Sequence, residues 1–234
     1  MNLALIIAGG SGERCGGDTP KQFIPICGHP VIAYTLKKYQ VHPRIDAICV
    51  VVLAGWESYV RNIAEKYNIS KLKHIATGGA SGQESIYNGL CELAKHYAGD
   101  CMVLVHDAVR PVIPDGIIDN AIDVATKFGN AVSGTPCYEA IIHTAKNTVV
   151  EHHELNRAQA PQCMRLGELV DAHKMALARG IKNSTTSATL MIALGRQIFW
   201  SKGSNQNIKL TTADDLETLR AIIGWNADEY NLDK

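Results

Sequence analysis

The chain lacks an excess of charge of either sign, because 23 lysines and arginines balance 23 aspartates and glutamates among its 234 residues. This balance argues against a general nucleic-acid coat and against a polybasic membrane anchor, and it leaves room for a local basic pocket. No apolar run approaches the ~20 residues of a transmembrane helix. The first eight residues carry no basic segment, unlike a secretory signal peptide. We therefore expect neither nucleic acid nor a membrane as a partner.

Paired cysteine motifs are also missing. The chain has seven cysteines, an odd number, and no two of them have CxxC spacing. Several lie in apolar runs, as Cys49 does within residues 47–53. This pattern predicts reduced, buried thiols and a cytoplasmic protein, and it argues against a structural zinc site. A chain of this length corresponds to one domain and buries enough apolar surface to need no disulfide.

Apolar, β-branched runs alternate with segments of helical periodicity. Continuous runs such as residues 47–53 are typical of strands buried on both faces of a parallel sheet. The pattern predicts strands at 3–7, 47–53, 75–79 (with a turn), 101–105, 130–136 and 197–200. It predicts helices at 31–40, 57–67, 82–98, 115–128, 166–179 and 213–223. This order favours an α/β fold with a Rossmann-like, doubly wound, mostly parallel sheet.

Two segments depart from this alternation. Residues 137–158 interrupt it and contain a short β-branched run at 148–150, flanked by polar residues. We interpret this segment as a protruding β-arm of a single domain spanning 1–234, with dimerisation as its role. The polar tail at 225–234 is expected to be loosely held.

A glycine-rich loop follows the first predicted strand and is followed by two basic residues, Arg14 and Lys21. It is neither a P-loop nor a dinucleotide fingerprint, because GxxxxGK[ST] is absent and GxGxxG fails after Gly12. Glycines let backbone N–H groups approach an anion closely, and two cations beside them suit a triphosphate. The alternative is a plain glycine turn with a solvated arginine and lysine.

The loop is the first of several motifs that together resemble one family. Residues 8–14 (AGGSGER) and 20–23 (PKQF) are followed, in order, by 78–79 (GG), 84–90 (ESIYNGL), 105–111 (VHDAVRP), 159–162 (QAPQ), 207–212 (NIKLTT) and 214–216 (DDL). In this order they resemble the cytidylyltransferases that act on 2-C-methyl-D-erythritol 4-phosphate and on ribitol 5-phosphate. The resemblance covers about residues 3–222.

The resemblance implies a nucleotide-diphospho-sugar transferase type of sheet, a homodimer formed through the arm, CTP as co-substrate and Mg²⁺ as cofactor. An acceptor phosphate attacks the α-phosphorus of CTP and pyrophosphate leaves, so the protein mainly positions the reactants and neutralises charge. The implied catalytic residues are Arg14, Lys21 and Lys209. The implied CTP-binding residues are Ala8, Gly9, Gly10, Ser11, Gly12, Gly78, Gly79 and Ser85.

The polyol phosphate acceptor is expected to contact a further set of residues. These are Asp107, Arg110, Glu139, Ala140, His152, Ala160 and Thr185. Asp107, at the end of a predicted strand, is also the candidate metal ligand, and its alternative is an Asx cap. Arg110 either binds phosphate or pairs with Asp107, and we favour the pairing. His106 is expected to be a packed histidine, and residues 214–215 are expected to cap a helix.

On the acceptor side, several positions differ from the family pattern. The changes are Ala160 for Thr, Glu139 for Asp, Ala140 for Thr, His152 for Arg, the TTSA of 185–188 for Thr-Asp-Asp-Ala, and Gly82 for Arg. Lost hydroxyl and guanidinium groups change which polyol fits, because unpaired buried polar groups are costly. Val109 and the 55–56 segment favour ribitol 5-phosphate.

Three functions remain open at this point. The first is CMP transfer to a polyol phosphate, either ribitol 5-phosphate for a surface polysaccharide or methylerythritol phosphate for isoprenoids. The second is another nucleotidyltransferase of the same fold, which would be expected to carry a second metal-binding aspartate near Lys209. The third is a non-catalytic nucleotide-binding protein, and the retained cations argue against it.

Overall fold

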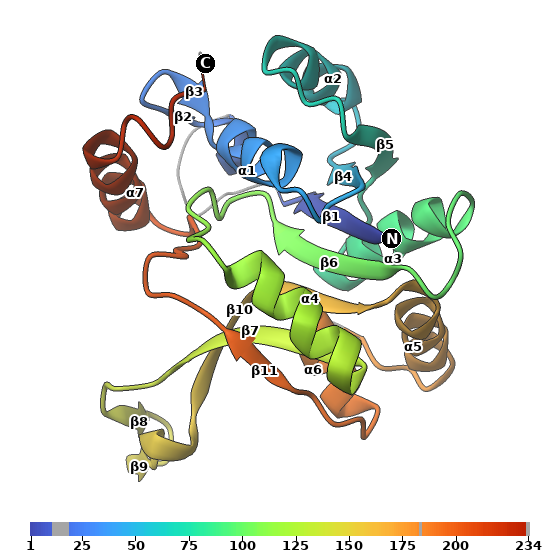
Figure 1. The fold of residues 1–234 in the computed structure, drawn as a ribbon. Helices are drawn as coiled ribbons and strands as arrows, with labels where there is room; N and C mark the ends of the chain where they lie inside the picture. The colour runs from blue at the N-terminus through green and yellow to red at the C-terminus, as the bar shows by residue number, and fades with distance from the viewer. Residues whose placement is uncertain (11–18, 183, 233–234) are drawn as a thin grey trace.

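A seven-stranded sheet forms the centre of this computed structural model, which describes residues 1–10, 19–182 and 184–232 (Figure 1). Its strand order is β11-β7-β10-β6-β1-β4-β5. The strands are β1 (Asn2–Ala8), β4 (Ala47–Val52), β5 (Leu72–Thr77), β6 (Met102–Asp107), β7 (Asn130–Pro136), β10 (Asn156–Arg165) and β11 (Trp200–Lys202). β10 runs antiparallel to both of its neighbours, and the other neighbouring strands of this sheet pair in parallel. The sheet is therefore mostly parallel, as predicted.

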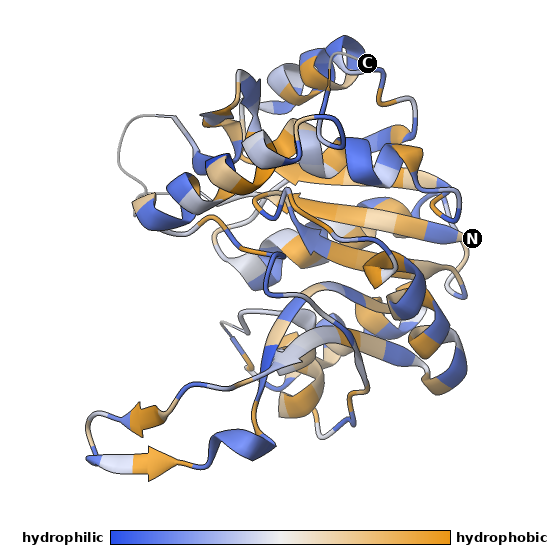
Figure 2. Ribbon diagram, turned by 60° about the vertical axis from the view of Figure 1, so that its left-hand side comes forward, coloured by the Kyte–Doolittle hydropathy of each residue, from blue (hydrophilic) through white to orange (hydrophobic). Residues whose placement is uncertain are grey.

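Helices cover both faces of this sheet because its strands are apolar on both faces. Along β1, Ala4 and Ile6 belong to one core cluster, whereas Leu3 and Leu5 belong to the other. The first cluster contains residues of α1 (Val31–Val41), α2 (Glu57–Lys66), α4 (Ile117–Phe128) and α7 (Ala213–Trp225). The second contains residues of α3 (Gly82–Ala94), α5 (Leu166–Ala178) and α6 (Ser187–Ala193). Figure 2 shows the resulting apolar central layer.

The predicted arm is a hairpin that projects from the body (Figures 1 and 2). Its strands β8 (Ile141–His143) and β9 (Thr148–Val150) pair antiparallel, and a short 3-10 helix, η3 (His152–Glu154), follows them. Three of its apolar side chains, Tyr138, Ile142 and Val149, are 71%, 58% and 68% exposed. The arm therefore presents apolar surface that its own chain leaves uncovered.

Some predictions require correction. The tail is docked, because Tyr230 and Leu232 are buried in the core. β10 was not predicted, because its polar residues and Pro161 do not form the continuous apolar run that indicates a buried strand. It is nevertheless an antiparallel strand whose second half is buried. The expected strand at 197–200 lies at Trp200–Lys202, and α3 ends at Ala94 rather than 98. α6 was not predicted either, and Cys27 is exposed rather than buried.

The strand order also determines where a ligand can bind. The chain passes from β1 to β4 and β5 on one side, then returns to the other side of β1 as β6. Such a reversal leaves a crevice outside the carboxyl ends of the two central strands. Ile7 of β1 pairs with Asp107 of β6, and the N–H of Ala108 donates to the carbonyl of Ile7 at 2.9 Å. Among the described helices, none has the length and apolar character needed to cross a bilayer.

Two small elements complete the described fold. The 3-10 helix η2 (Lys21–Phe23) precedes a two-stranded sheet of β2 (Pro25–Ile26) and β3 (His29–Pro30). The α7 helix begins at Thr212, whose hydroxyl and main chain form a capping box with Asp215, while Asp214 lies in the first turn. The predicted capping role of 214–215 is thus confirmed for Asp215.

Candidate active site

A cavity lies at the crevice between β1 and β6, and it collects most of the residues that the sequence predicted for the site. Those lining it are Ala8, Gly9, Gly10, Lys21, Ser85, Asp107, Arg110, Ala160, Thr185 and Lys209. They come from the ends of β1 and β6 and the residues just after them, from η2, from the start of α3, from β10, and from the segments before α6 and after β11. One concave site therefore receives both the phosphate-binding and the acceptor-binding candidates.

Asp107 holds two cations at this cavity. Its Oδ2 accepts a hydrogen bond from Nε of Arg110 at 2.9 Å, and its Oδ1 accepts one from Nζ of Lys209 at 2.9 Å. Arg110 is anchored further, because its Nη1 donates to the carbonyl of Asn207 at 2.7 Å. The N–H of Leu210 donates to the carbonyl of Val109 at 2.9 Å, which holds the Lys209 segment beside β6. The predicted pairing of Arg110 with Asp107 is present.

These contacts keep the carboxyl of Asp107 ionised. Burial by itself would raise its pKa, but Lys209 and Arg110 outweigh burial and hold the pKa well below the ordinary range. The ionised carboxylate contributes stability in full above its unfolded pKa, and this contribution is lost progressively as the pH falls from there through the lowered pKa of the folded state. About a quarter of the Asp107 side chain remains exposed, so a ligand in the cavity can reach it. The neighbouring Lys209 is 41% exposed.

Backbone from two loops converges on Ser85. The Ser85 hydroxyl accepts a hydrogen bond from the N–H of Gly79 at 3.0 Å. A Cβ on Gly9 would lie 3.0 Å from the same hydroxyl oxygen, and one on Gly78 would lie 3.2 Å from it. α3 can sit this close because Gly89 has no Cβ, which would meet Val51 at 2.5 Å. The glycines at 9, 78 and 79 therefore allow a close approach of main chain that side chains would prevent.

Neighbouring side chains fix the backbone around Lys21. The amide of Gln22 is buried and donates to the carbonyl of Ala8 at 2.7 Å, tying η2 to the end of β1. Phe23 is buried as well and stacks on Trp56 with ring centroids 4.7 Å apart. Lys21 thus extends from an anchored turn at the edge of the cavity. Gln22 belongs to the PKQF motif at 20–23, and its role was not predicted from the sequence.

A second set of buried amides was also missed, and it fixes the part of the cavity around Ala160 and Thr185. Gln159 donates to the carbonyl of Ser204 at 2.8 Å and accepts from its N–H at 3.1 Å. Gln162 accepts from the N–H of Ala188 at 2.8 Å, which fixes the start of α6 beside Thr185. Asn207 donates to the carbonyl of Ala160 at 2.6 Å. The sequence shows these amides only as the glutamines and the asparagine of the motifs at 159–162 and 207–212. It does not show their hydrogen-bond partners, because those partners are far away in sequence.

Other predicted residues lie elsewhere. Gly78 and Gly79 adjoin the cavity through Ser85 rather than lining it. Glu139, Ala140 and His152 belong to the arm, and none of them lines this chain's cavity. Ser11, Gly12 and Arg14 fall outside the described residues.

His106 is buried, as predicted for a packed histidine. Its Nε2 lies 3.2 Å from the carbonyl oxygen of Arg110, and its Nδ1 has no hydrogen-bond partner among the described residues. Burial lowers the pKa of His106 to about 4, so the imidazole is neutral at neutral pH. The enclosed ring supports the end of β6, and His106 also belongs to the lining of the cavity.

Comparisons with known proteins agree with this geometry. The family model of IspD, 2-C-methyl-D-erythritol 4-phosphate cytidylyltransferase, matches residues 2–224. The chain is 38% identical over 228 residues to a ribitol-5-phosphate cytidylyltransferase of Vibrio parahaemolyticus, covering 95% of this chain and 96% of that protein. It is 35% identical over 220 residues to a 2-C-methyl-D-erythritol 4-phosphate cytidylyltransferase of Clostridium botulinum, covering 92% and 94%.

A solved structure extends the agreement to the fold. The 2-C-methyl-D-erythritol 4-phosphate cytidylyltransferase of Francisella tularensis is 28% identical, has a TM-score of 0.76, and is matched over 94% of this chain and 99% of that one. On the family match and these full-length relatives, the chain belongs to the IspD family of cytidylyltransferases and is a nucleotidyltransferase.

Proposed function

We propose that this cytidylyltransferase moves CMP from CTP to ribitol 5-phosphate or a closely similar alditol phosphate, and releases pyrophosphate. The choice of acceptor is supported by the 38% identity, over nearly the full length of both chains, to a protein named ribitol-5-phosphate cytidylyltransferase. A second relative of that name, from Lacticaseibacillus paracasei, is 34% identical over 229 residues. The alternative acceptor is 2-C-methyl-D-erythritol 4-phosphate, which the relative from Clostridium botulinum supports at 35% identity.

The proposed reaction brings two anions together. An oxygen of the acceptor phosphate forms a bond to the α-phosphorus of CTP, and the bond from that phosphorus to the bridging oxygen of pyrophosphate breaks. No enzyme nucleophile is required, since the attacking phosphate is already ionised. The main barrier is repulsion between the phosphates, so cations fixed beforehand at the reacting phosphorus supply most of the acceleration.

In this proposal Lys21 and Lys209 approach the α-phosphorus from two sides of the cavity. Both line it, Lys21 from the anchored η2 turn and Lys209 from the segment held beside β6. Arg14, outside the described residues, is assigned the same role from sequence. Asp107 positions Lys209 through their 2.9 Å hydrogen bond and prevents Arg110 from turning away. Main chain at Gly9 and Gly10 binds phosphate, and the Gly78–Gly79 turn beside Ser85 holds the nucleoside.

Magnesium fits this site through Asp107. Mg²⁺ in nucleotide enzymes is held by one or two carboxylates together with substrate phosphates. Oδ2 of Asp107 accepts one hydrogen bond from Arg110 and Oδ1 accepts one from Lys209, so each oxygen has a further lone pair that can bind a metal. When bound, the ion would neutralise triphosphate charge. We therefore keep Mg²⁺ as the cofactor and Asp107 as its protein ligand.

The acceptor side of the cavity is consistent with an altered polyol. Both Ala160 and Thr185 line it. The family pattern has a threonine at the position of Ala160, and Thr185 is the first residue of TTSA, which replaces the acidic Thr-Asp-Asp-Ala of the family pattern. Ala160 is buried and offers no hydroxyl, so it cannot donate to a substrate oxygen. Glu139, Ala140 and His152 join the acceptor site only if the arm of a second copy reaches it. The proposal therefore includes a homodimer built through the arm.

The first prediction concerns Lys21. Replacing it by alanine should lower kcat by about 10²–10³, the effect of removing one preorganised charge contact, and should leave the melting temperature unchanged. The measurement is pyrophosphate release at saturating CTP. Lys174, 62% exposed on α5, provides the matched lysine-to-alanine control and should retain full activity. Near-normal turnover of Lys21→Ala would remove Lys21 from the mechanism.

The second prediction concerns substrates. With Mg²⁺ present, kcat/KM for ribitol 5-phosphate should exceed that for 2-C-methyl-D-erythritol 4-phosphate by at least about tenfold, because the loss of hydrogen-bond partners in the acceptor pocket discriminates strongly between acceptors. The kcat/KM for CTP should also exceed that for UTP. Excess EDTA should abolish turnover. Ala160→Thr restores a hydroxyl at a cavity position and should shift the ratio toward methylerythritol phosphate. A wide preference of the wild type for methylerythritol phosphate contradicts the proposed acceptor.

The third prediction concerns the arm. Sedimentation at micromolar concentration should give a dimer, because exposed Ile142 and Val149 need a partner surface. Substituting both by aspartate should produce a folded monomer with a raised KM for the acceptor. The matched control is Leu177→Asp, at a 59% exposed position on α5, which should remain dimeric. A monomeric wild-type chain refutes the role of the arm.

A further inference from the structure

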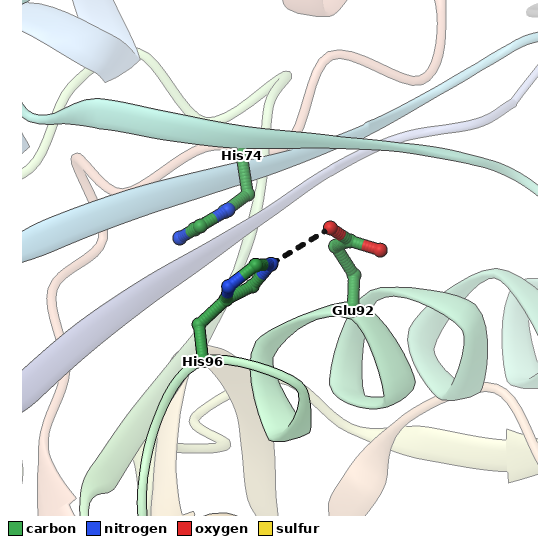
Figure 3. A group of neighbouring side chains, drawn as sticks. All are labelled: His74, Glu92 and His96. Atoms are coloured by element: carbon green, nitrogen blue, oxygen red, sulfur yellow. Dashed lines mark hydrogen bonds and ion pairs between the residues drawn. The ribbon is translucent and has the colours of Figure 1, made fainter.

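A cluster of metal-binding residue types lies at the edge of the sheet, away from the cavity. His74 belongs to β5, the edge strand, while Glu92 and His96 lie in the last turn of α3 and just after it. One potential ligand atom from each of the three residues lies within 4.8 Å of the others. Figure 3 shows the three side chains facing one another between strand and helix. None of the three lines the cavity.

Chain geometry explains how these residues meet. Glu92 lies in the last turn of α3 and His96 in the turn that follows it, where the N–H of His96 donates to the carbonyl of Leu93 at 3.0 Å. This turn brings Nε2 of His96 to 3.3 Å from Oε1 of Glu92. The rings of His74 and His96 stack with centroids 4.2 Å apart and an interplanar angle of 17°. His74 and His96 are 22 positions apart in sequence, which is why their spacing gave no sign of a site.

The surroundings suit a cation. The neutral imidazole of a histidine such as His74 offers one ring-nitrogen lone pair to a metal. The hydroxyl of Tyr97 lies 3.2 Å from Nε2 of His74; when Nε2–H donates to it, Nδ1 carries the lone pair. Lys95 binds Oε2 of Glu92 at 2.6 Å, and Oε1 is left on the histidine side. The C-terminal end of a helix also attracts positive charge.

We propose that His74, Glu92 and His96 form a second cation site, for Zn²⁺ or a similar transition-metal dication, which fastens the edge strand β5 to the end of α3. Two imidazoles and a carboxylate are typical zinc ligands, whereas Mg²⁺ prefers an all-oxygen shell. Binding requires the stacked rings to turn until their lone pairs converge. Three protein ligands leave a fourth position for water, and the 43% exposed His96 gives the ion a path from solvent.

The site is independent of cytidylyl transfer. It would act by stabilising the folded chain, since a ligand that binds only the native state raises the free energy of unfolding. The two elements that it joins also lead to the cavity, because Gly78 directly follows β5 and Ser85 lies in the first turn of α3. Loss of the cation site should nevertheless leave turnover unchanged, because in the described part of the chain neither histidine hydrogen-bonds to or pairs with a residue assigned to catalysis.

The test is a Zn²⁺ titration of the full chain, produced without a histidine tag and stripped of metal, in excess Mg²⁺ to saturate oxygen-ligand sites. Calorimetry should show one Zn²⁺ per chain, and near-saturating Zn²⁺ should raise the melting temperature by about 5–10 °C. His74→Asn and His96→Asn should each weaken Zn²⁺ binding at least tenfold, with pyrophosphate release unchanged. His153→Asn is the matched control, an exposed arm histidine beside Glu151 and Glu154, and should bind as the wild type does.

Co²⁺ absorption gives a second measurement, independent of protein stability. Nitrogen and oxygen ligands produce d–d bands without a thiolate charge-transfer band, and these bands should disappear in His96→Asn. The proposal is overturned if the wild type binds no Zn²⁺, if both histidine variants bind it unchanged, or if the Co²⁺ spectrum shows thiolate ligands. If the wild-type protein shows no cytidylyl transfer, that result counts against the proposed function and not against the cation site, because Zn²⁺ binding is measured without substrate.

Discussion

The carboxylate of Asp107 is the constraint around which the site is built. It ends β6 at the reversal point of the sheet and binds Arg110 and Lys209 through separate oxygens, each at 2.9 Å. Without that charge, two cations would stand close together in a partly enclosed cavity, and each would turn toward solvent. Removing one member of such a cluster leaves the others uncompensated, which costs more than the pair itself contributes.

This ion cluster also links parts of the fold that are distant in sequence. Arg110 reaches the carbonyl of Asn207, and Asn207 in turn donates to the carbonyl of Ala160 at the acceptor side. A single chain of contacts therefore joins β6, the β10 segment and the Lys209 segment. In our proposal this connection allows the enzyme to fix cations for the triphosphate and the shape of the acceptor pocket together. Changes at Ala160 can then alter the acceptor while the donor side stays intact.

The sequence predicted most of what depends on local pattern. Continuous apolar runs identified β1, β4 and β6, and helical periodicity identified α1, α4 and α5, because burial on both faces or on one face has a distinct spacing. Lys21, Asp107 and Lys209 were found through ordered motifs, and the structure brings them to one cavity. The pairing of Arg110 with Asp107 follows from their short separation along the chain.

What was missed depends on long-range contacts. β10 contains glutamines and a proline, and only its place between β6 and β7 makes it a strand. Gln159 and Gln162 gained roles from partners 45 and 26 residues away. The docking of Tyr230 and the meeting of His74 with His96 are also tertiary events. Local propensity carries no information about such partners.

The most direct test of the account is the kinetics of Asp107→Asn, which keeps the side-chain shape and removes the charge. Pyrophosphate release from CTP with ribitol 5-phosphate should fall by at least about 10²-fold, because Lys209 loses its anchor and, in our proposal, Mg²⁺ loses its protein ligand. Asp123→Asn, at an exposed carboxylate that pairs with Arg44, should retain wild-type rates. A folded Asp107→Asn enzyme with near-normal kcat and KM would contradict the claim that this carboxylate organises the site.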